Sequence, residues 1–194
     1  MLFKPDRRRY RGAIERMRPT FKTRSGQTLR VRLLQPQDAP LLLDLYHQLS
    51  PESRRRRFHG NVDNLSPEVL AQGASDLANV DNLTVRGAVV ATQRNGRGEE
   101  EIVAIARLAR PLGVPDAPCA EAAIVVRDDF QGQGIGSELL RRLVLLAKRM
   151  RIQTMVASFN SYNEGAIKLF RELNLPYTID IEHGETEMRI EMPQ

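Results

Sequence analysis

The sequence predicts an α/β fold in which helices flank a mixed central sheet. Three observations lead to this fold class. An alternating strand pattern followed by helical patterns occupies the first third, consecutive strand patterns fill the middle, and strands alternate with helices after a glycine-rich turn. The chain has 194 residues without an internal repeat or a low-complexity linker, so we expect one folded domain.

The first third begins with a strand and continues with helices. Residues 28–34 (TLRVRLL) alternate apolar and basic side chains, which is the period-two pattern of a strand. Asp38 precedes an apolar helix pattern (APLLLDLYHQL) as a candidate N-cap. Ser50 and Ser66 each open a Ser-Pro-Glu sequence, in which serine can cap a helix and proline fits its first position.

The middle of the chain predicts three strands. Two apolar segments, LTVRGAVVAT and EIVAIARLAR, flank a polar loop with Asn95-Gly96, a strong signal for a β-hairpin. Residues 121–127 (EAAIVVR) are almost continuously apolar, as expected for a strand buried on both faces. Asp128 and Asp129 follow it and are interpreted as turn residues.

The last third predicts further helices and strands. A helix follows the glycine-rich turn, then a strand (152–159) and a second helix (164–173). Two short strands near 177–181 and 187–191 are expected to close the chain as a hairpin across His183-Gly184.

The positive charge is concentrated at the N-terminus. Residues 1–24 hold nine lysines and arginines against two acidic residues, whereas the formal net charge of the whole chain is +5. We therefore expect a basic arm (1–24) and a folded domain (25–194). The arm lacks interleaved aromatic residues, so we interpret it as a solvated or packing segment and do not expect nucleic acid as a partner. Because it lies far from the candidate site in sequence, its deletion is expected to leave cofactor affinity nearly unchanged.

The composition argues against several classes of protein. No apolar run approaches the ~20 residues of a membrane span, and no signal peptide is visible. Cys119 is the single cysteine and is interpreted as a packing residue, and the three histidines lack the spacing of metal ligands. We expect a cytoplasmic protein without membrane contact and without a metal.

The glycine-rich turn FQGQGIGSELL (130–140) runs directly into a helix. Glycines followed by a helix suit an anion, because the first N–H groups of the helix lack internal acceptors. The spacing G-x-G-x-G differs from the dinucleotide fingerprint G-x-G-x-x-G, and the turn lacks the lysine of a P-loop. A turn that only lets a strand and a helix pack closely is the alternative.

Residues 131–136 (QGQGIG) match Q/R-x-x-G-x-G/A and resemble the pyrophosphate-binding motif of the GNAT N-acetyltransferase superfamily, as does the order of elements from Thr28 onward. The resemblance implies a mostly antiparallel central sheet, acetyl-CoA as co-substrate and a pantetheine arm that pairs with the strand before the turn. The cofactor-binding residues that it implies, together with the turn, are Ile124, Val125, Val126, Gln131, Gly132, Gln133, Gly134, Ile135, Gly136, Ser137 and Asn163.

Acetyl transfer needs an amine with a free lone pair, whereas a lysine is mostly protonated at neutral pH. Glu121 stands at the entry of the strand expected to hold the thioester and is our candidate general base. The alternative is a carboxylate paired with an arginine. Phe170 stands where many family members carry a tyrosine that protonates the leaving thiolate, so that acid must be water, another residue, or absent.

A second resemblance concerns the acceptor. Residues 45–60 (LYHQLSPESRRRRFHG) and the strand sequence AEAA resemble bacterial Pat-type protein lysine acetyltransferases. This implies direct transfer to a protein lysine, with Arg57 and Phe58 shaping the acceptor entrance. Three alternatives remain. Arg54 to Arg57 could form a solvated helix end, the acceptor could be a small amine such as a polyamine or an antibiotic, or the protein could be a non-catalytic acyl-CoA-binding module. The oligomeric state stays open.

Overall fold

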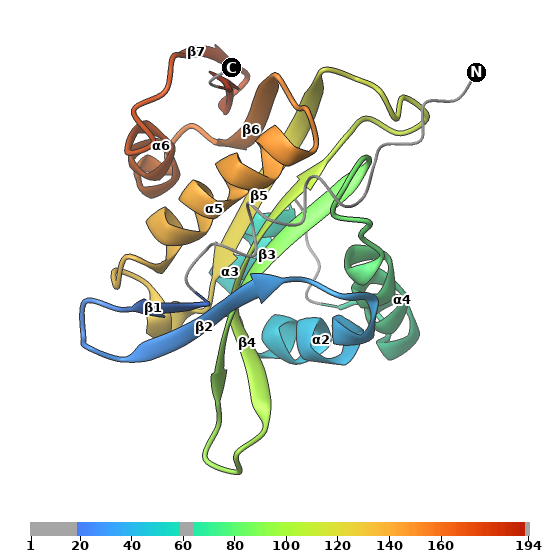
Figure 1. The fold of residues 1–194 in the computed structure, drawn as a ribbon, viewed down its shortest axis with the longest axis vertical. Helices are drawn as coiled ribbons and strands as arrows, with labels where there is room; N and C mark the ends of the chain where they lie inside the picture. Colours follow the sequence, from blue (N-terminus) through green and yellow to red (C-terminus); the bar gives the residue numbers. More distant parts are fainter. Residues whose placement is uncertain (1–18, 59–63, 193–194) are drawn as a thin grey trace.

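The computed structural model describes residues 19–58 and 64–192. Within them, eight strands form one sheet in the order β1-β2-β3-β4-β5-β6-β8-β7. All neighbouring strands are antiparallel except β5 and β6, which are parallel. The predicted mixed α/β fold with a mostly antiparallel sheet is therefore confirmed (Figure 1).

The strands are β1 (Thr20–Lys22), β2 (Thr28–Leu33), β3 (Arg86–Arg94), β4 (Glu100–Ala109), β5 (Cys119–Val126), β6 (Thr154–Asn160), β7 (Tyr177–Glu182) and β8 (Glu185–Glu191). The helices are α2 (Ala39–Gln48), α3 (Pro51–Phe58), α4 (Pro67–Ala78), α5 (Ile135–Arg149) and α6 (Glu164–Arg171), with short 3-10 helices η1 (Pro36–Asp38) and η2 (Asp128–Phe130). Both predicted hairpins, β3–β4 and β7–β8, are present.

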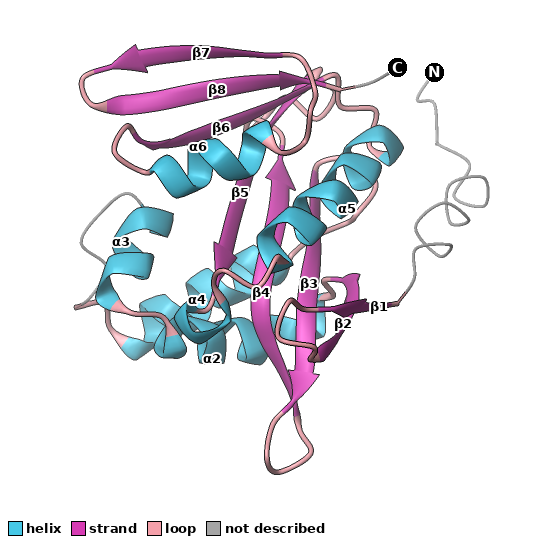
Figure 2. Ribbon diagram, turned by 90° about the vertical axis from the view of Figure 1, so that its left-hand side faces the viewer, coloured by secondary structure: helices cyan, strands magenta, loops and turns pink. Residues whose placement is uncertain are grey.

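The sheet separates two apolar cores. On one face, α5 packs on β3, β4 and β5 through leucines such as Leu139 and Leu143, both fully buried. On the other face, α2 and α4 cover side chains such as Val90 and Ile105. Figure 1 shows the central strands between these two groups of helices, and Figure 2 shows β6, β8 and β7 at one end of the molecule. None of the helices in the described ranges is long and apolar enough to cross a membrane.

The predicted serine caps are confirmed. Ser66 Oγ accepts a hydrogen bond from the Val69 N–H at 3.4 Å at the start of α4. Ser50 Oγ accepts one from the Ser53 N–H at 3.2 Å at the start of α3. In both cases proline follows the serine, since its fixed φ and missing N–H are tolerated in the first turn of a helix.

Asp38 has a different role from the predicted cap. It holds the N-cap position of α2, but its side chain makes no capping bond. Its carboxylate instead accepts two hydrogen bonds from the Arg32 guanidinium, at 2.6 and 2.9 Å, and one from the Gln35 N–H at 2.8 Å. Asp38 is buried, so a bidentate arginine is a stronger partner than a helix terminus.

The N-terminal boundary of the sheet also differs from the prediction. Thr20–Lys22 falls within the segment assigned to the basic arm, yet it forms the edge strand β1, antiparallel to β2. A strand of three residues carries too little periodicity to be recognised in sequence. Residues 1–18 of the predicted arm lie outside the described residues.

Replacing Asp38 by serine separates the ion pair from a capping role. Serine is a good N-cap, so a capping function would survive. The mostly buried Arg32 would lose a carboxylate, and we expect the free energy of unfolding to fall by about 3 kcal/mol in chemical denaturation. Ser66→Ala, which removes a true cap, should cost about 1 kcal/mol. An Asp38→Ser cost no larger than that of Ser66→Ala would refute the ion pair as the contribution of Asp38.

Candidate functional site

The parallel strands β5 and β6 separate soon after they meet. Their pairing joins Cys119–Glu121 to residues 154–156 and ends there. Beyond this point β5 stays paired with β4, and β6 stays paired with β8. Among the described residues, no strand pairs with this side of β5 after Glu121, so its backbone edge from Ala122 to Val126 borders the gap.

A cleft of about 430 Å³ occupies the divergence between the two strands. It brings together most of the residues predicted for the site: Arg57, Glu121, Ile124, Val125, Val126, Gln131, Gly132, Gly134, Ile135, Gly136, Ser137 and Asn163. The edge of β5 forms part of the cleft, so the side chains of Ile124 to Val126 are only partly buried. The expectation of a strand buried on both faces is therefore wrong for this part of β5. Gln133 and Phe58 do not line the cleft.

The three glycines of the turn answer different physical demands. Gly132 and Gly134 have positive φ angles of 71° and 83°, which L side chains rarely adopt. Gly136 faces Leu169 of α6, where a Cβ atom would approach the leucine methyls to 3.1 Å. The close-packing alternative therefore applies to Gly136 and not to the other two.

The start of α5 presents free donors to the cleft. Gly134 is the N-cap and offers no side chain, and the first α-helical bond runs from the Glu138 N–H to the Gly134 carbonyl. The N–H groups of Ile135, Gly136 and Ser137 precede that bond, and these residues line the cleft. With the positive end of the helix dipole, this arrangement suits an anion.

The β1–β2 hairpin braces the same turn. The Arg24 N–H donates to the Gln133 carbonyl at 3.1 Å, and the Arg24 guanidinium donates to the Gly132 carbonyl at 3.3 Å. Arg24 also lines the cleft, and the Phe21 ring lies near Gly134. The expectation that residues up to Arg24 lie away from the cofactor site is therefore wrong for these two, because folding joins segments more than 100 positions apart.

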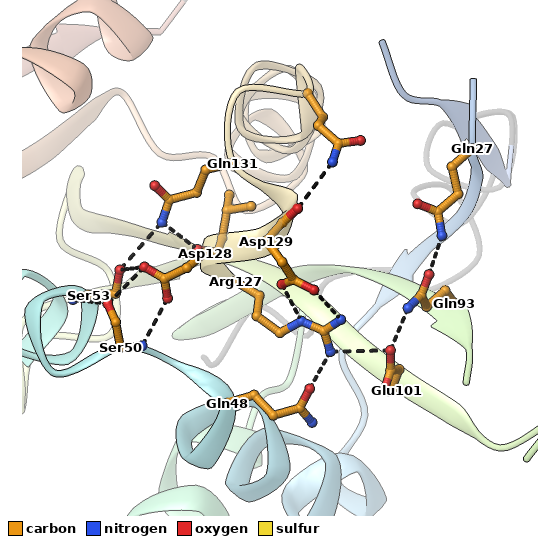
Figure 3. A network of polar contacts seen from close by, with 12 residues as sticks. Gln27, Gln48, Ser50, Ser53, Gln93, Glu101, Arg127, Asp128, Asp129 and Gln131 are labelled. Carbon is orange, nitrogen blue, oxygen red and sulfur yellow. Dashed lines mark hydrogen bonds and ion pairs between the residues drawn. The ribbon is translucent and has the colours of Figure 1, made fainter. Parts of the chain in front are cut away.

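Asp128 fixes α3 to the end of β5 (Figure 3). Its carboxylate accepts from the Ser50 N–H at 2.9 Å, from Ser50 Oγ at 2.8 Å and from Ser53 Oγ at 2.7 Å. Burial acts against the charged form, but these hydrogen bonds hold the pKa of Asp128 below its usual value. Gln131 adds to the junction by donating to the Val126 carbonyl at 3.1 Å. The turn residue of the sequence analysis is thus an anchor.

Glu121 is exposed at the far end of the cleft from the glycine turn and has arginines around it. Burial lowers the pKa of Arg57, against the opposing charge of Glu121. Burial is also the main reason why the pKa of Arg107 is lowered to about 10. The positive charges of Arg57 and Arg86 contribute to this lowering, whereas the negative charge of Glu121 raises the pKa. No arginine in the described ranges forms an ion pair with Glu121, although the charges of Arg57 and Arg107 interact with it.

Helix α6 closes the cleft without a tyrosine. Phe170 is buried, lines the cleft and stacks on Phe159 of β6, with 6.2 Å between ring centroids. Tyr162, one of the nearby tyrosines, is 88% exposed. Asn163 caps α6 by accepting from the Ala166 N–H at 3.1 Å.

A second, apolar cavity of about 220 Å³ lies beside the first. Arg57 and Val125 line both, whereas Phe58 lines only the second, together with α2 and α4. The Arg57 guanidinium lies 5.1 Å from the centre of the Phe58 ring.

His59 and Gly60, which end the segment of the second resemblance, lie outside the described residues. The ranges that the structure describes contain no cluster of three or more histidines, cysteines and acidic residues that could hold a metal ion.

Comparisons with known proteins agree with this geometry. The model of the acetyltransferase (GNAT) family matches residues 51–175. Acetyltransferase PA5475 of Pseudomonas aeruginosa is 28% identical over 138 residues, which are 71% of this chain and 69% of that protein. The GNAT domain of S. lividans PAT has a TM-score of 0.73 and 28% identity over 89% of this chain and 95% of that one.

The fold is also that of yncA from Salmonella typhimurium, whose structure includes its cofactor acetyl-CoA. Its TM-score is 0.57 at 20% identity, over 86% of this chain and 95% of that one. The family model covers more than half of the chain, and it matches the part that contains the glycine turn, β5 and Glu121. The chain therefore belongs to the GNAT family and is an N-acetyltransferase.

Proposed function

We propose that the protein transfers an acetyl group directly from acetyl-CoA to a lysine side chain of a protein, with Glu121 as general base. One observation carries the proposal. The unpaired edge of β5 runs from the anion site at the glycine turn to the carboxylate of Glu121, within one cleft. A cofactor with a diphosphate at one end and a thioester at the other fits this arrangement.

The cofactor end suits a diphosphate without a metal. The N–H groups at the start of α5 supply donors, and Arg24 supplies a cation at the mouth of the same turn. The backbone edge next to Ile124, Val125 and Val126 can pair with the amides of a pantetheine arm as an added strand would. Asn163, at the start of α6, borders the opposite wall.

The chemistry then needs few protein groups. Acetyl-CoA supplies a thioester carbonyl; the amine attacks it, a C–N bond forms and the C–S bond breaks. Glu121 accepts the proton of the attacking amine, directly or through water. A backbone N–H near Val125 meets the negative charge that develops on the carbonyl oxygen. Phe170 has no proton to give, so the thiolate leaves unprotonated or takes a proton from water.

Two observations support a protein lysine as acceptor. Residues 45–60 resemble Pat-type lysine acetyltransferases, and the described part of this segment places Arg57 beside Glu121. The similarity to the GNAT domain of S. lividans PAT extends over 95% of that domain. A small amine is the second candidate, favoured by the apolar cavity that shares Arg57 with the cleft.

Gly134→Asp tests the anion site. The change places a side chain at a φ of 83° and a carboxylate where the diphosphate would lie. We expect CoA affinity to fall at least ~100-fold in calorimetric titration. Circular dichroism checks that the variant is folded, and unchanged affinity in a folded variant would place the diphosphate elsewhere.

Arg24→Gln tests the contribution of the hairpin. An exposed cation near a diphosphate contributes about 1 kcal/mol or less, so we expect CoA binding to weaken by up to roughly fivefold, with the difference shrinking at high salt. Arg97→Gln, in the β3–β4 hairpin loop, is the matched control and should bind as the wild type does. Equal affinities for all three proteins would show that Arg24 does not contact the cofactor.

Glu121→Gln removes the charge with almost no change of shape. If Glu121 accepts the amine proton, kcat should fall ~10²–10⁴-fold while CoA affinity stays the same. Raising the pH should partly restore the rate, since more of the amine is then already deprotonated. Glu187→Gln, on β8, should retain full activity. Full activity of Glu121→Gln at neutral pH would eliminate Glu121 as the base.

A further inference from the structure

Three arginines and one glutamate share one face of the sheet at the acceptor end. Glu121 lies opposite Ala109 in the β4–β5 register, and Arg86 lies opposite the same alanine in the β3–β4 register. Arg107 lies opposite Ala123, two residues further along β5. Because side chains directly opposite one another, and those two positions apart, lie on one face, these three side chains project to the same side.

Arg57 reaches this face from α3. Asp128 accepts hydrogen bonds from Ser50 and Ser53 at the start of α3 and holds this helix against the end of β5. The Arg57 side chain lines the cleft together with Glu121 and lies close enough for their charges to interact. The position of this guanidinium is therefore set by the same anchor that fixes α3 to the cleft.

The charges that interact around Glu121 do not balance. The three arginines exceed the single glutamate by two positive charges. Arg107 Nε is buried and has no hydrogen-bond partner in the described part of the chain. Such a group is costly to bury unless an acceptor meets it, and the described residues supply none.

Arg110, which follows the last residue of β4 and lies three positions after Arg107, shows how a buried structural arginine is bonded in this protein. Its guanidinium donates to the carbonyls of Thr84, Ala117 and Met150, so that each nitrogen has an acceptor. By contrast, Arg107 Nε is buried without an acceptor among the described residues. Arg107 Nε therefore remains open to an acceptor that the described residues do not supply.

We propose that the acceptor carries a carboxylate close to its reactive amine, and that Arg57 and Arg107 bind this carboxylate while the amine lies at Glu121. The inference rests on the proposed transfer at Glu121 and narrows its substrate. An anion would balance the excess positive charge and provide the missing hydrogen-bond acceptor. A polycation such as a polyamine would instead meet like charge, which argues against that class of small amine.

The carboxylate can come from two sources with the same chemistry. One is an aspartate or glutamate next to the target lysine in a protein, and the other is the α-carboxylate of a free amino acid. The test uses the full chain with acetyl-CoA and measures CoA release. The acceptors are three peptides of equal length with one lysine flanked by aspartate, serine or arginine, together with free lysine and lysine amide.

We expect kcat/KM to be at least about tenfold higher for the acceptor with the carboxylate, because its KM is lower. The difference should appear either between the aspartate-flanked and the serine-flanked peptide or between free lysine and lysine amide. The pair that shows the preference identifies the source. Arg57→Gln and Arg107→Met should each remove most of the preference, because the acceptor with the carboxylate loses more of its kcat/KM than the neutral acceptor does. Arg97→Gln, the remote control, should keep it.

A stability measurement separates this role from a structural one. Arg107→Met should melt at the same temperature as the wild type or higher, because a buried, incompletely bonded cation is removed. Arg110→Met should melt at a lower temperature. Equal rates of the wild type with carboxylate-bearing and neutral acceptors would overturn this inference but not the proposed N-acetylation. CoA binding without transfer to any amine would overturn the proposed function itself.

Discussion

Strands β5 and β6 pair over only three residues, and the functional part of the molecule depends on that early separation. Each strand is held firmly on its other side, β5 by β4 and β6 by β8, so neither can move across to close the gap. The stacked rings of Phe159 and Phe170 tie β6 to α6 on the far wall. The two strands that border the cleft are therefore held by regular hydrogen-bonded sheet, which would give a bound thioester a fixed position.

The two ends of the cleft are connected through the last residues of β5. Asp128 holds α3, and with it Arg57, while Gln131 bonds both to Val126 and to Ser53 (Figure 3). The neighbouring Arg127 bonds Asp129 and Glu101 at 2.7 and 3.2 Å and also contacts Gln48 of α2. Elements that contribute to the cofactor end and elements that contribute to the acceptor end thus share one short segment, so a change in this segment would affect both.

The sequence predicted what local patterns determine. The order of strands and helices, the cap at Ser66, both hairpins and the residues of the glycine turn follow from periodicity and turn chemistry within a few positions. It missed the pairing of Asp38 with Arg32, the anchor at Asp128 and the contacts of Arg24, because their partners lie on other elements. It also missed the unpartnered Nε of Arg107, because burial depends on how several elements pack together. From the sequence alone, an arginine on an exposed surface cannot be distinguished from a buried arginine that lacks hydrogen-bond acceptors. The role of Glu121 stays a prediction, since position alone does not establish proton transfer.

The third glycine of the turn has a consequence for the family as a whole. The motif Q/R-x-x-G-x-G/A accepts alanine at the position of Gly136, yet in this chain Leu169 leaves no room there without a shift of its methyl groups. The motif therefore combines two requirements of different origin: backbone freedom at Gly134 and a fit between two helices at Gly136. Relatives with alanine at the third position should carry a smaller or differently placed side chain opposite it, so that the two sites covary across the family.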